Sequence, residues 1–329
     1  MRWQLSEEQE AYRQSFGAWL ADVAPREAVR RWLDDGDAAE FAGRLVRDGW
    51  AGVGVPEALG GQGGGLVELA LTAELLAAAS APSATWLATA LAVPALGSGT
   101  DVAAFEGEHA ALLSPADAIP GAGPRLTIDG EGRLHGTVPR VLAGDLAARF
   151  VAVVDGQGGS PCLRLASASA GVRAETRRLL DRSRSVADVV MEGAPSEPLD
   201  VDAREFLAGC AARAAVLVAA DSLGAMARML DLAVTYSKQR HQFGVPIGSF
   251  QAVKHAAASI LVEVEAARSA GTTPRKSSAR TAASCASILT AATAGRTTLR
   301  HSAAESTGRR RDVPASWGTT RRRGSARRA

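Results

Sequence analysis

The sequence predicts an α+β protein with several domains, and three observations support this prediction. Apolar residues recur at helical spacing near the N-terminus and again after residue 204. Between these regions, turn signals such as Asp129-Gly130 separate short runs rich in Val, Leu and Ile, as in β-strands. Charge is also unevenly distributed along the sequence, because residues 271–329 contain 13 Lys and Arg but only 2 Asp and Glu. We therefore expect four parts: an N-terminal helical domain (1–110), a middle β domain (111–203), a C-terminal helical domain (204–270) and a low-complexity basic tail (271–329).

The N-terminal region predicts a capped helix. Ser6 and Gln9 form a candidate capping box, in which each side chain accepts a hydrogen bond from the other residue's backbone N–H. An apolar face follows at helical spacing: Tyr12, Phe16, Trp19, Leu20 and Val23. The almost uniformly apolar residues 66–79 predict a second helix that is buried on most sides.

The middle region predicts a small β domain, and a barrel is the architecture that we expect. Residues 150–154 and 186–191 are its clearest strands. Helical periodicity then returns, with a long helix at about 207–239, a turn at 244–246 and another helix from 250 to 270.

Composition also limits the class of protein. The three cysteines, Cys162, Cys210 and Cys285, are far apart, which predicts reduced thiols and a cytoplasmic location. The five histidines are scattered, so we expect no metal site. We find no signal-peptide pattern and no uninterrupted apolar stretch long enough to span a bilayer, so we expect no membrane association.

The run at residues 236–255, YSKQRHQFGVPIGSFQAVKH, carries most of the functional information. A guanidinium such as that of Arg240 binds a pyrophosphate bidentately better than an ammonium does. Gln242 and Gln251 offer amide groups, and Phe243 offers an aromatic face to a planar ring. The run resembles the signature Tyr-x-x-x-Arg-x-Gln-Phe-Gly-x-Pro-Ile-x-x-Phe-Gln-x-Val-x-His of the acyl-CoA dehydrogenase family. Residues 52–63 resemble the family's Gly-x-x-x-Pro-Glu-x-x-Gly-Gly-x-Gly turn, and the whole resemblance covers about residues 1–270.

This resemblance implies an FAD-dependent dehydrogenase of acyl-CoA thioesters, with helical, β-barrel and helical domains in that order. It implies an oligomer, either homomeric or heteromeric, in which the signature reaches the flavin of a neighbouring chain. The residues that it implies as FAD contacts are Arg240, Gln242, Phe243, Ile247 and Gln251. Electron-transfer flavoprotein is the implied electron acceptor.

The sequence departs from the family at the catalytic base, so the catalytic residues remain unknown. Removal of the α-proton needs a carboxylate close to the α-carbon. The family places it late in the C-terminal domain or early in the long helix, at about Ala214 here. Neither position holds an acid, because Glu305 and Asp312 are the only acids after residue 270. Asp221, further along the long helix, is a remote candidate.

A second departure concerns the segment that reads Thr-Glu-Pro-x-x-Gly-Ser-Asp in the family and faces the flavin and the substrate. Here residues 113–118 read LSPADA, so only Ser114 keeps a hydroxyl. The C-terminal domain would comprise only its first two helices before the tail begins.

The tail consists mainly of Thr, Ser, Ala, Arg and Gly and is predicted to be disordered. A frameshift in a GC-rich gene is the favoured explanation. A genuine basic arm for nucleic acid or acidic partners is less favoured, because aromatic residues are not interleaved with the charges. A natural truncation with an unrelated tail is the third explanation.

Three functions remain open at this point. The first is an acyl-CoA dehydrogenase that is catalytically incomplete as the sequence stands. The second is a non-catalytic subunit that completes the flavin site of a heteromeric enzyme. The third is a basic-tailed binding protein without flavin.

Overall fold

The computed structural model describes residues 5–36, 38–57, 60–96 and 108–271. The N-terminal region is helical, as predicted, with five α-helices and two short 3₁₀ turns in its described part: α1 (Glu7–Val23), α2 (Arg26–Asp35), α3 (Ala39–Arg47), η1 (Trp50–Gly52), α4 (Leu66–Ala79), α5 (Ala84–Ala92) and η3 (Val93–Ala95). The predicted capping box is present, because Gln9 N donates to Ser6 Oγ at 3.2 Å and Ser6 N donates to Gln9 Oε1 at 3.1 Å. Phe16 and Phe41 are completely buried in the core of these helices.

The middle region forms a sheet of seven strands: β1 (Ala110–Leu112), β2 (Thr127–Ile128), β3 (Arg133–Leu142), β4 (Arg149–Asp155), β5 (Pro161–Ser167), β6 (Val172–Arg177) and β7 (Val186–Pro198). A 3₁₀ turn, η5 (Gln157–Gly159), links β4 and β5. The strand order is β1-β4-β5-β7-β3-β2, and β6 pairs with β7. β7 is long enough to change partners, pairing first with β3 and β6 and then, through residues 196–198, with β5.

This change of partners folds the sheet around a buried cluster that includes Phe150, Val189 and Met191. Among the strands that the structure describes, β1 and β2 lie at opposite ends of the order and do not pair with each other. The sheet is therefore not closed, and the predicted barrel is not confirmed. The α+β content is confirmed, because helices flank this sheet on both sides in the sequence.

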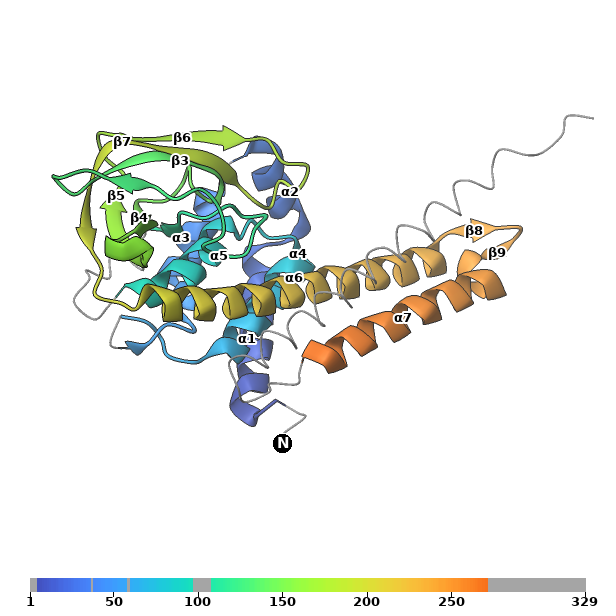
Figure 1. Ribbon diagram of the computed structural model, residues 1–329. Helices are drawn as coiled ribbons and strands as arrows, with labels where there is room; N and C mark the ends of the chain where they lie inside the picture. Colours follow the sequence, from blue (N-terminus) through green and yellow to red (C-terminus); the bar gives the residue numbers. More distant parts are fainter. Residues whose placement is uncertain (1–4, 37, 58–59, 97–107, 272–329) are drawn as a thin grey trace, which may run out of the picture.

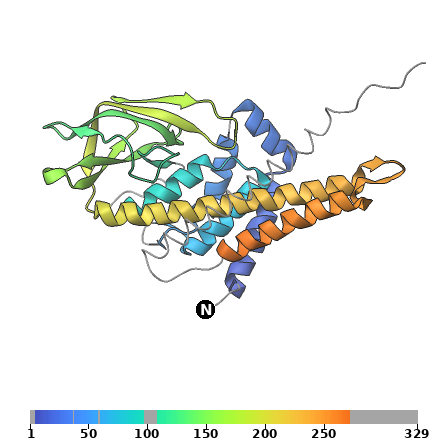
Figure 2. The ribbon, with the colours of Figure 1, turned by 45° about the vertical axis from the view of Figure 1, so that its right-hand side comes forward.

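The C-terminal region is a long antiparallel helical hairpin that projects beyond the rest of the molecule (Figures 1 and 2). α6 (Ala203–Gln239) starts at Asp202, whose side chain accepts hydrogen bonds from the N–H groups of Arg204 and Glu205. β8 (His241–Gln242), β9 (Val245–Pro246) and η6 (Ile247–Ser249) form the tip, and α7 (Gln251–Gly271) returns alongside α6. The two predicted helices are thus confirmed, and the first begins slightly earlier than predicted.

α6 is apolar as well as long, with an 18-residue window of mean hydropathy 1.6. By length and composition alone it meets the criteria for a membrane-crossing helix, which differs from the sequence prediction that no stretch is long enough. Core helices meet the same criteria, and α6 contributes Leu217, Phe206 and Met226 to three different buried clusters.

α5 lies at the centre of the described body. Trp86 packs with the N-terminal helices, Ala88 with the middle sheet, and Ala92 with the cluster that includes the start of α6. The predicted domain boundaries therefore divide segments that share contacts through α5, and they stay predictions. The predicted tail lies, apart from Gly271, outside the described residues.

Candidate functional site

The residues predicted to bind the cofactor lie together at the tip of the α6–α7 hairpin (Figure 1). Arg240 caps α6, and its N–H donates to Tyr236 O at 2.9 Å. β8 and β9 then pair, and their connecting residues Phe243 and Gly244 have φ angles of 53° and 80°. Two successive positive φ angles define the tight turn that joins short antiparallel strands, and the glycine adopts its φ without strain.

The tip presents these side chains to solvent. Three of the predicted polar contacts are exposed: Arg240, Gln242 and Gln251. Phe243 is 93% exposed and contacts Phe250 edge-on, with ring centroids 6.3 Å apart, while Ile247 is half-buried. Among the described residues, the Arg240 guanidinium has no ion-pair or hydrogen-bond partner. An exposed aromatic ring beside a free guanidinium indicates a binding surface.

The second predicted region, residues 113–118, lies at the end of β1, and we refer to it as the middle-domain edge. Ser114 is only 8% exposed, and its Oγ accepts a hydrogen bond from Gly121 N at 3.0 Å. Asp117 accepts two hydrogen bonds from the Arg140 guanidinium, at 3.0 and 3.1 Å, and these lower the pKa of its carboxyl. Both polar side chains are therefore engaged by groups of the same chain.

Backbone strain is concentrated near this edge. Arg140 and Ala143 both have a φ of 51°, in the left-handed region that non-glycine residues rarely adopt. Arg140 N donates to Asp188 Oδ1 at 2.9 Å. Asp188 also accepts hydrogen bonds from Arg177, which lower the pKa of the Asp188 carboxyl. Strained residues tend to cluster at functional sites.

One face of α6 runs past the middle-domain edge. Leu207, Ala214 and Asp221 follow each other at intervals of two helical turns and so share this face. Leu207 contacts Gly121 in the loop after β1, and Asp221 forms an ion pair with Arg184 in the turn before β7. Ala214 lies between Leu207 and Asp221 on this face, and its side chain is only a methyl group.

Asp221 is the carboxylate on this face, and it is held by the middle domain. Arg184 donates to Asp221 Oδ1 and also to Ser83 Oγ at 2.8 Å. These bonds join α6, the turn before β7 and the residue that precedes α5. A carboxylate engaged in this way is not free to accept a substrate proton, which argues against Asp221 as the base.

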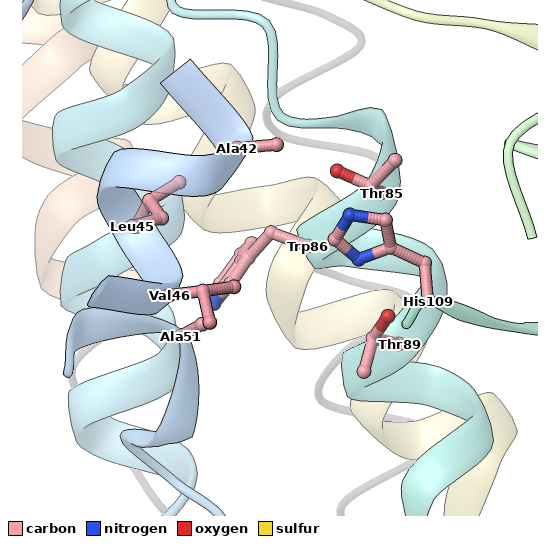
Figure 3. Close-up of a pocket in the computed structure, with 8 residues that line it drawn as sticks. All are labelled: Ala42, Leu45, Val46, Ala51, Thr85, Trp86, Thr89 and His109. Carbon is pink, nitrogen blue, oxygen red and sulfur yellow. The ribbon is translucent and has the colours of Figure 1, made fainter. Parts of the chain in front are cut away.

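A small pocket lies between α3, α5 and the residue before β1 (Figure 3). Its lining is mostly apolar: Ala42, Leu45, Val46, Ala51, Thr85, Trp86, Thr89 and His109. Burial lowers the pKa of His109, so its ring is neutral at pH 7. Thr89 Oγ1 accepts a hydrogen bond from Ala110 N at 3.3 Å. None of the described residues that line this pocket is a carboxylate, so the pocket does not supply the kind of base that the resemblance implies.

Comparison with known proteins agrees with the hairpin signature. Models of the acyl-CoA dehydrogenase N-terminal and C-terminal domains match residues 6–102 and 208–273. Acyl-CoA dehydrogenase IpdE2 of Mycobacterium tuberculosis is 35% identical over 267 residues, which are 80% of this chain and 74% of that relative. The chain belongs to the acyl-CoA dehydrogenase family.

Solved structures share the fold. A variant of the Tcur3481–Tcur3483 steroid ACAD is similar at 26% identity and a TM-score of 0.69, over 80% of this chain and 76% of that one. Butyryl-CoA dehydrogenase of Megasphaera elsdenii is similar at 22% identity and a TM-score of 0.76, over 94% of this chain and 90% of that one.

Acyl-CoA dehydrogenases are oxidoreductases, and their cofactor is FAD. The hairpin tip fits this cofactor, because it offers a free guanidinium, amides and an exposed aromatic ring. At the middle-domain edge of this acyl-CoA dehydrogenase, Ser114 Oγ accepts a hydrogen bond from Gly121 N and the Asp117 carboxylate accepts hydrogen bonds from Arg140.

Sequence reasoning did not identify Gly121, Arg140 or Arg184. Each acts through a partner distant in sequence, for example Arg140 with Asp117, 23 residues away, and Arg184 with Asp221, 37 residues away. Four arginines lie between residues 177 and 184, but their spacing in the sequence does not show which of them form ion pairs across elements.

Proposed function

We propose that this chain takes part in the α,β-dehydrogenation of an acyl-CoA thioester as one subunit of an FAD-containing oligomer. The observation that supports this most is the place of the flavin signature. Its residues stand exposed on a hairpin tip, far from the chain's own middle-domain edge.

Our proposal requires an oligomer because α6 separates the tip widely from the middle-domain edge of the same chain. α6 has 37 residues, so at a rise of about 1.5 Å per residue it is roughly 55 Å long. Leu207 lies in its second turn beside the middle-domain edge, whereas Arg240 caps its far end. A flavin dinucleotide is much shorter than this separation. One flavin can therefore contact a tip and a middle-domain edge only if they belong to different chains.

Two structural neighbours support an assembly of unlike chains. One is described as the ChsE4–ChsE5 complex of Mycobacterium tuberculosis and shares this fold at 23% identity and a TM-score of 0.73. The other is the Tcur3481–Tcur3483 steroid ACAD. In our proposal Arg240 binds the FAD pyrophosphate and Phe243 packs on a planar part of the cofactor. FAD supplies the acceptor for the hydride, and electron-transfer flavoprotein is the proposed next acceptor.

A second candidate is a non-catalytic subunit that completes the flavin site of a partner. The observation that favours it is the face of α6, where Ala214 offers no carboxylate and Asp221 is held by Arg184. In both candidates the tip binds FAD. The candidates differ in whether this chain removes the α-proton.

Anaerobic reduction of flavin by a panel of acyl-CoA thioesters separates the two candidates. The purified chain with added FAD should bleach the flavin slowly, because loss of a general base lowers the rate by about 10²–10⁴-fold. Rapid bleaching without any other protein would show that this chain contains its own base. Asp221→Asn would then be the first variant to measure.

A further inference from the structure

The small pocket between α3 and α5 contains three polar side chains that have no hydrogen-bond partner among the described residues. They are the hydroxyl of Thr85, the indole N–H of Trp86 and the imidazole of His109. Thr85 and Trp86 are only 8% and 6% exposed. Buried hydroxyl and indole N–H groups are nearly always hydrogen-bonded in folded proteins. These groups therefore need a partner from outside the chain, and the pocket is the place where such a partner can reach them.

The helix α5 and the residue before β1 hold these groups close together. Thr85 and Thr89 are one helical turn apart and so share a face of α5, and Trp86 lies beside them. Thr89 Oγ1 accepts a hydrogen bond from Ala110 N, which fixes the neighbouring His109 against this helix. The His109 ring lies between Thr85 and Thr89, whereas the Trp86 indole extends toward α3 (Figure 3). The polar groups thus come from one side of the pocket.

The opposite side of the pocket is apolar and is formed by Ala42, Leu45, Val46 and Ala51. None of the described residues that line the pocket carries a charge, because burial lowers the pKa of His109 and its ring is neutral at pH 7. An ion would lose its hydration here without gaining a counter-charge. The space inside, with its opening to solvent included, is about 310 Å³, which is at the lower end of the range for small-molecule pockets.

This pocket is separate from the surfaces discussed for the flavin. Among the described residues that line it, none belongs to α6, to the hairpin tip or to the middle-domain edge. Its unpartnered polar groups therefore have no part in the proposed dehydrogenation.

We propose that this pocket binds a small uncharged molecule that has an apolar body and one hydroxyl group. A hydroxyl both donates and accepts hydrogen bonds, so it matches the Thr85 hydroxyl and the neutral His109 ring, which has one donor and one acceptor nitrogen. The apolar body would lie against Leu45 and Val46 on the opposite side. Trp86 N–H can only donate, so it would bond the oxygen of the bound molecule.

Titration of the full chain with phenol, followed by the NMR signal of the Trp86 indole N–H, tests the proposal. The chain has six tryptophans, and Trp86→Phe identifies the signal that belongs to Trp86. Phenol should shift this signal saturably and should bind more tightly than toluene, which has a methyl group in place of the hydroxyl. Benzoate, which is charged, should bind more weakly than phenol.

Two results of these titrations would overturn the proposal. A pocket that recognises only apolar surface would bind toluene more tightly than phenol, because the methyl group of toluene gains more from burial. The absence of a saturable shift with phenol would show that water alone satisfies the three polar groups.

Variants of the pocket test which side chains bind the hydroxyl. Thr85→Val replaces the hydroxyl by a methyl group of similar size, so it should weaken phenol binding by about tenfold and leave toluene binding unchanged. Thr235→Val changes an exposed threonine of α6 in the same way and is the matched control. Unchanged affinity of Thr85→Val for phenol would overturn the proposal.

A second variant keeps the test decisive if Thr85→Val does not fold. Ala42→Leu fills the pocket from its apolar side, so it should weaken the binding of both phenol and toluene. A wild-type response of the Trp86 signal in this variant would show that phenol binds elsewhere and would overturn the proposal. FAD is absent from all these titrations, so their failure would leave the proposed function unaffected.

Discussion

An ideal Cβ on Gly224 of α6 would lie 1.9 Å from the backbone oxygen of Glu74 in α4. The two helices therefore approach so closely that no side chain fits between them. Glu74 also accepts a hydrogen bond from Arg268 Nη1 of α7 at 2.8 Å, so this one residue of α4 contacts both helices of the hairpin. The hairpin that carries the flavin signature is anchored here.

Gly224→Ala should therefore destabilise the protein. Its methyl group forces α4 and α6 apart, and overpacking of this kind typically costs about 1–3 kcal/mol. Gly209→Ala is the matched control on the same helix, because a Cβ at Gly209 meets nothing within 4 Å. The control should be stabilised by about 0.5–1 kcal/mol, the usual helix preference for Ala over Gly. Urea unfolding of both variants checks this, and equal stabilities would contradict the close crossing.

The raised pKa of Tyr12 predicts that the protein loses stability at high pH. Burial raises the pKa of Tyr12 to about 12, against the opposing effect of its hydrogen bond with Thr72 Oγ1 at 2.5 Å. The unfolded value is about 10, so the folded state favours the protonated phenol. This contribution is fully present below pH 10 and is lost as the pH rises from about 10 through about 12.

The free energy of unfolding should fall by at most roughly 2–3 kcal/mol, which is the equivalent of a difference of two pKa units between the folded and unfolded states. Free energies of unfolding between pH 9 and 12 should fall more steeply for the wild type than for Tyr12→Phe, which has no ionisable group there. Parallel curves for the two proteins would show that Tyr12 is not protonated more strongly in the folded state.

Arg240→Ala should weaken the retention of FAD. Loss of a hydrogen bond to a charged group costs about 1.5–3 kcal/mol, or roughly 10- to 100-fold in affinity. Arg228→Ala removes the same charge from the same helix, where Arg228 pairs with Asp231 at 2.6 Å, and it should retain FAD like the wild type. Flavin absorbance after gel filtration measures both. Equal flavin content in the wild type and both variants would show that Arg240 does not bind FAD.

Much of the fold was accessible from the sequence because it depends on local patterns. The capping box of Ser6 and Gln9, the buried helix at 66–79 and the long helix that ends before Arg240 follow from spacing and capping rules. The predicted barrel was not confirmed, because the partner change along β7 depends on pairings between distant strands.

In the candidate site, too, the residues of a local pattern could be predicted and the contacts between distant elements could not. Arg240, Gln242 and Phe243 were predicted from one continuous run, and the structure brings them to one tip. The ion pair of Arg184 with Asp221 joins different elements, so no local pattern indicates it. The cytoplasmic location, the role of electron-transfer flavoprotein and the roles of the individual signature residues stay predictions.

The central claim is that FAD bound through this tip is shared between chains. Light scattering coupled to gel filtration, with absorbance recorded at the protein and flavin bands, tests it most directly on the chain loaded with FAD. Our account predicts that all flavin absorbance elutes with a species of at least two chains, and that Arg240→Ala loses the flavin from that species. A monomer that carries one FAD per chain would contradict the account.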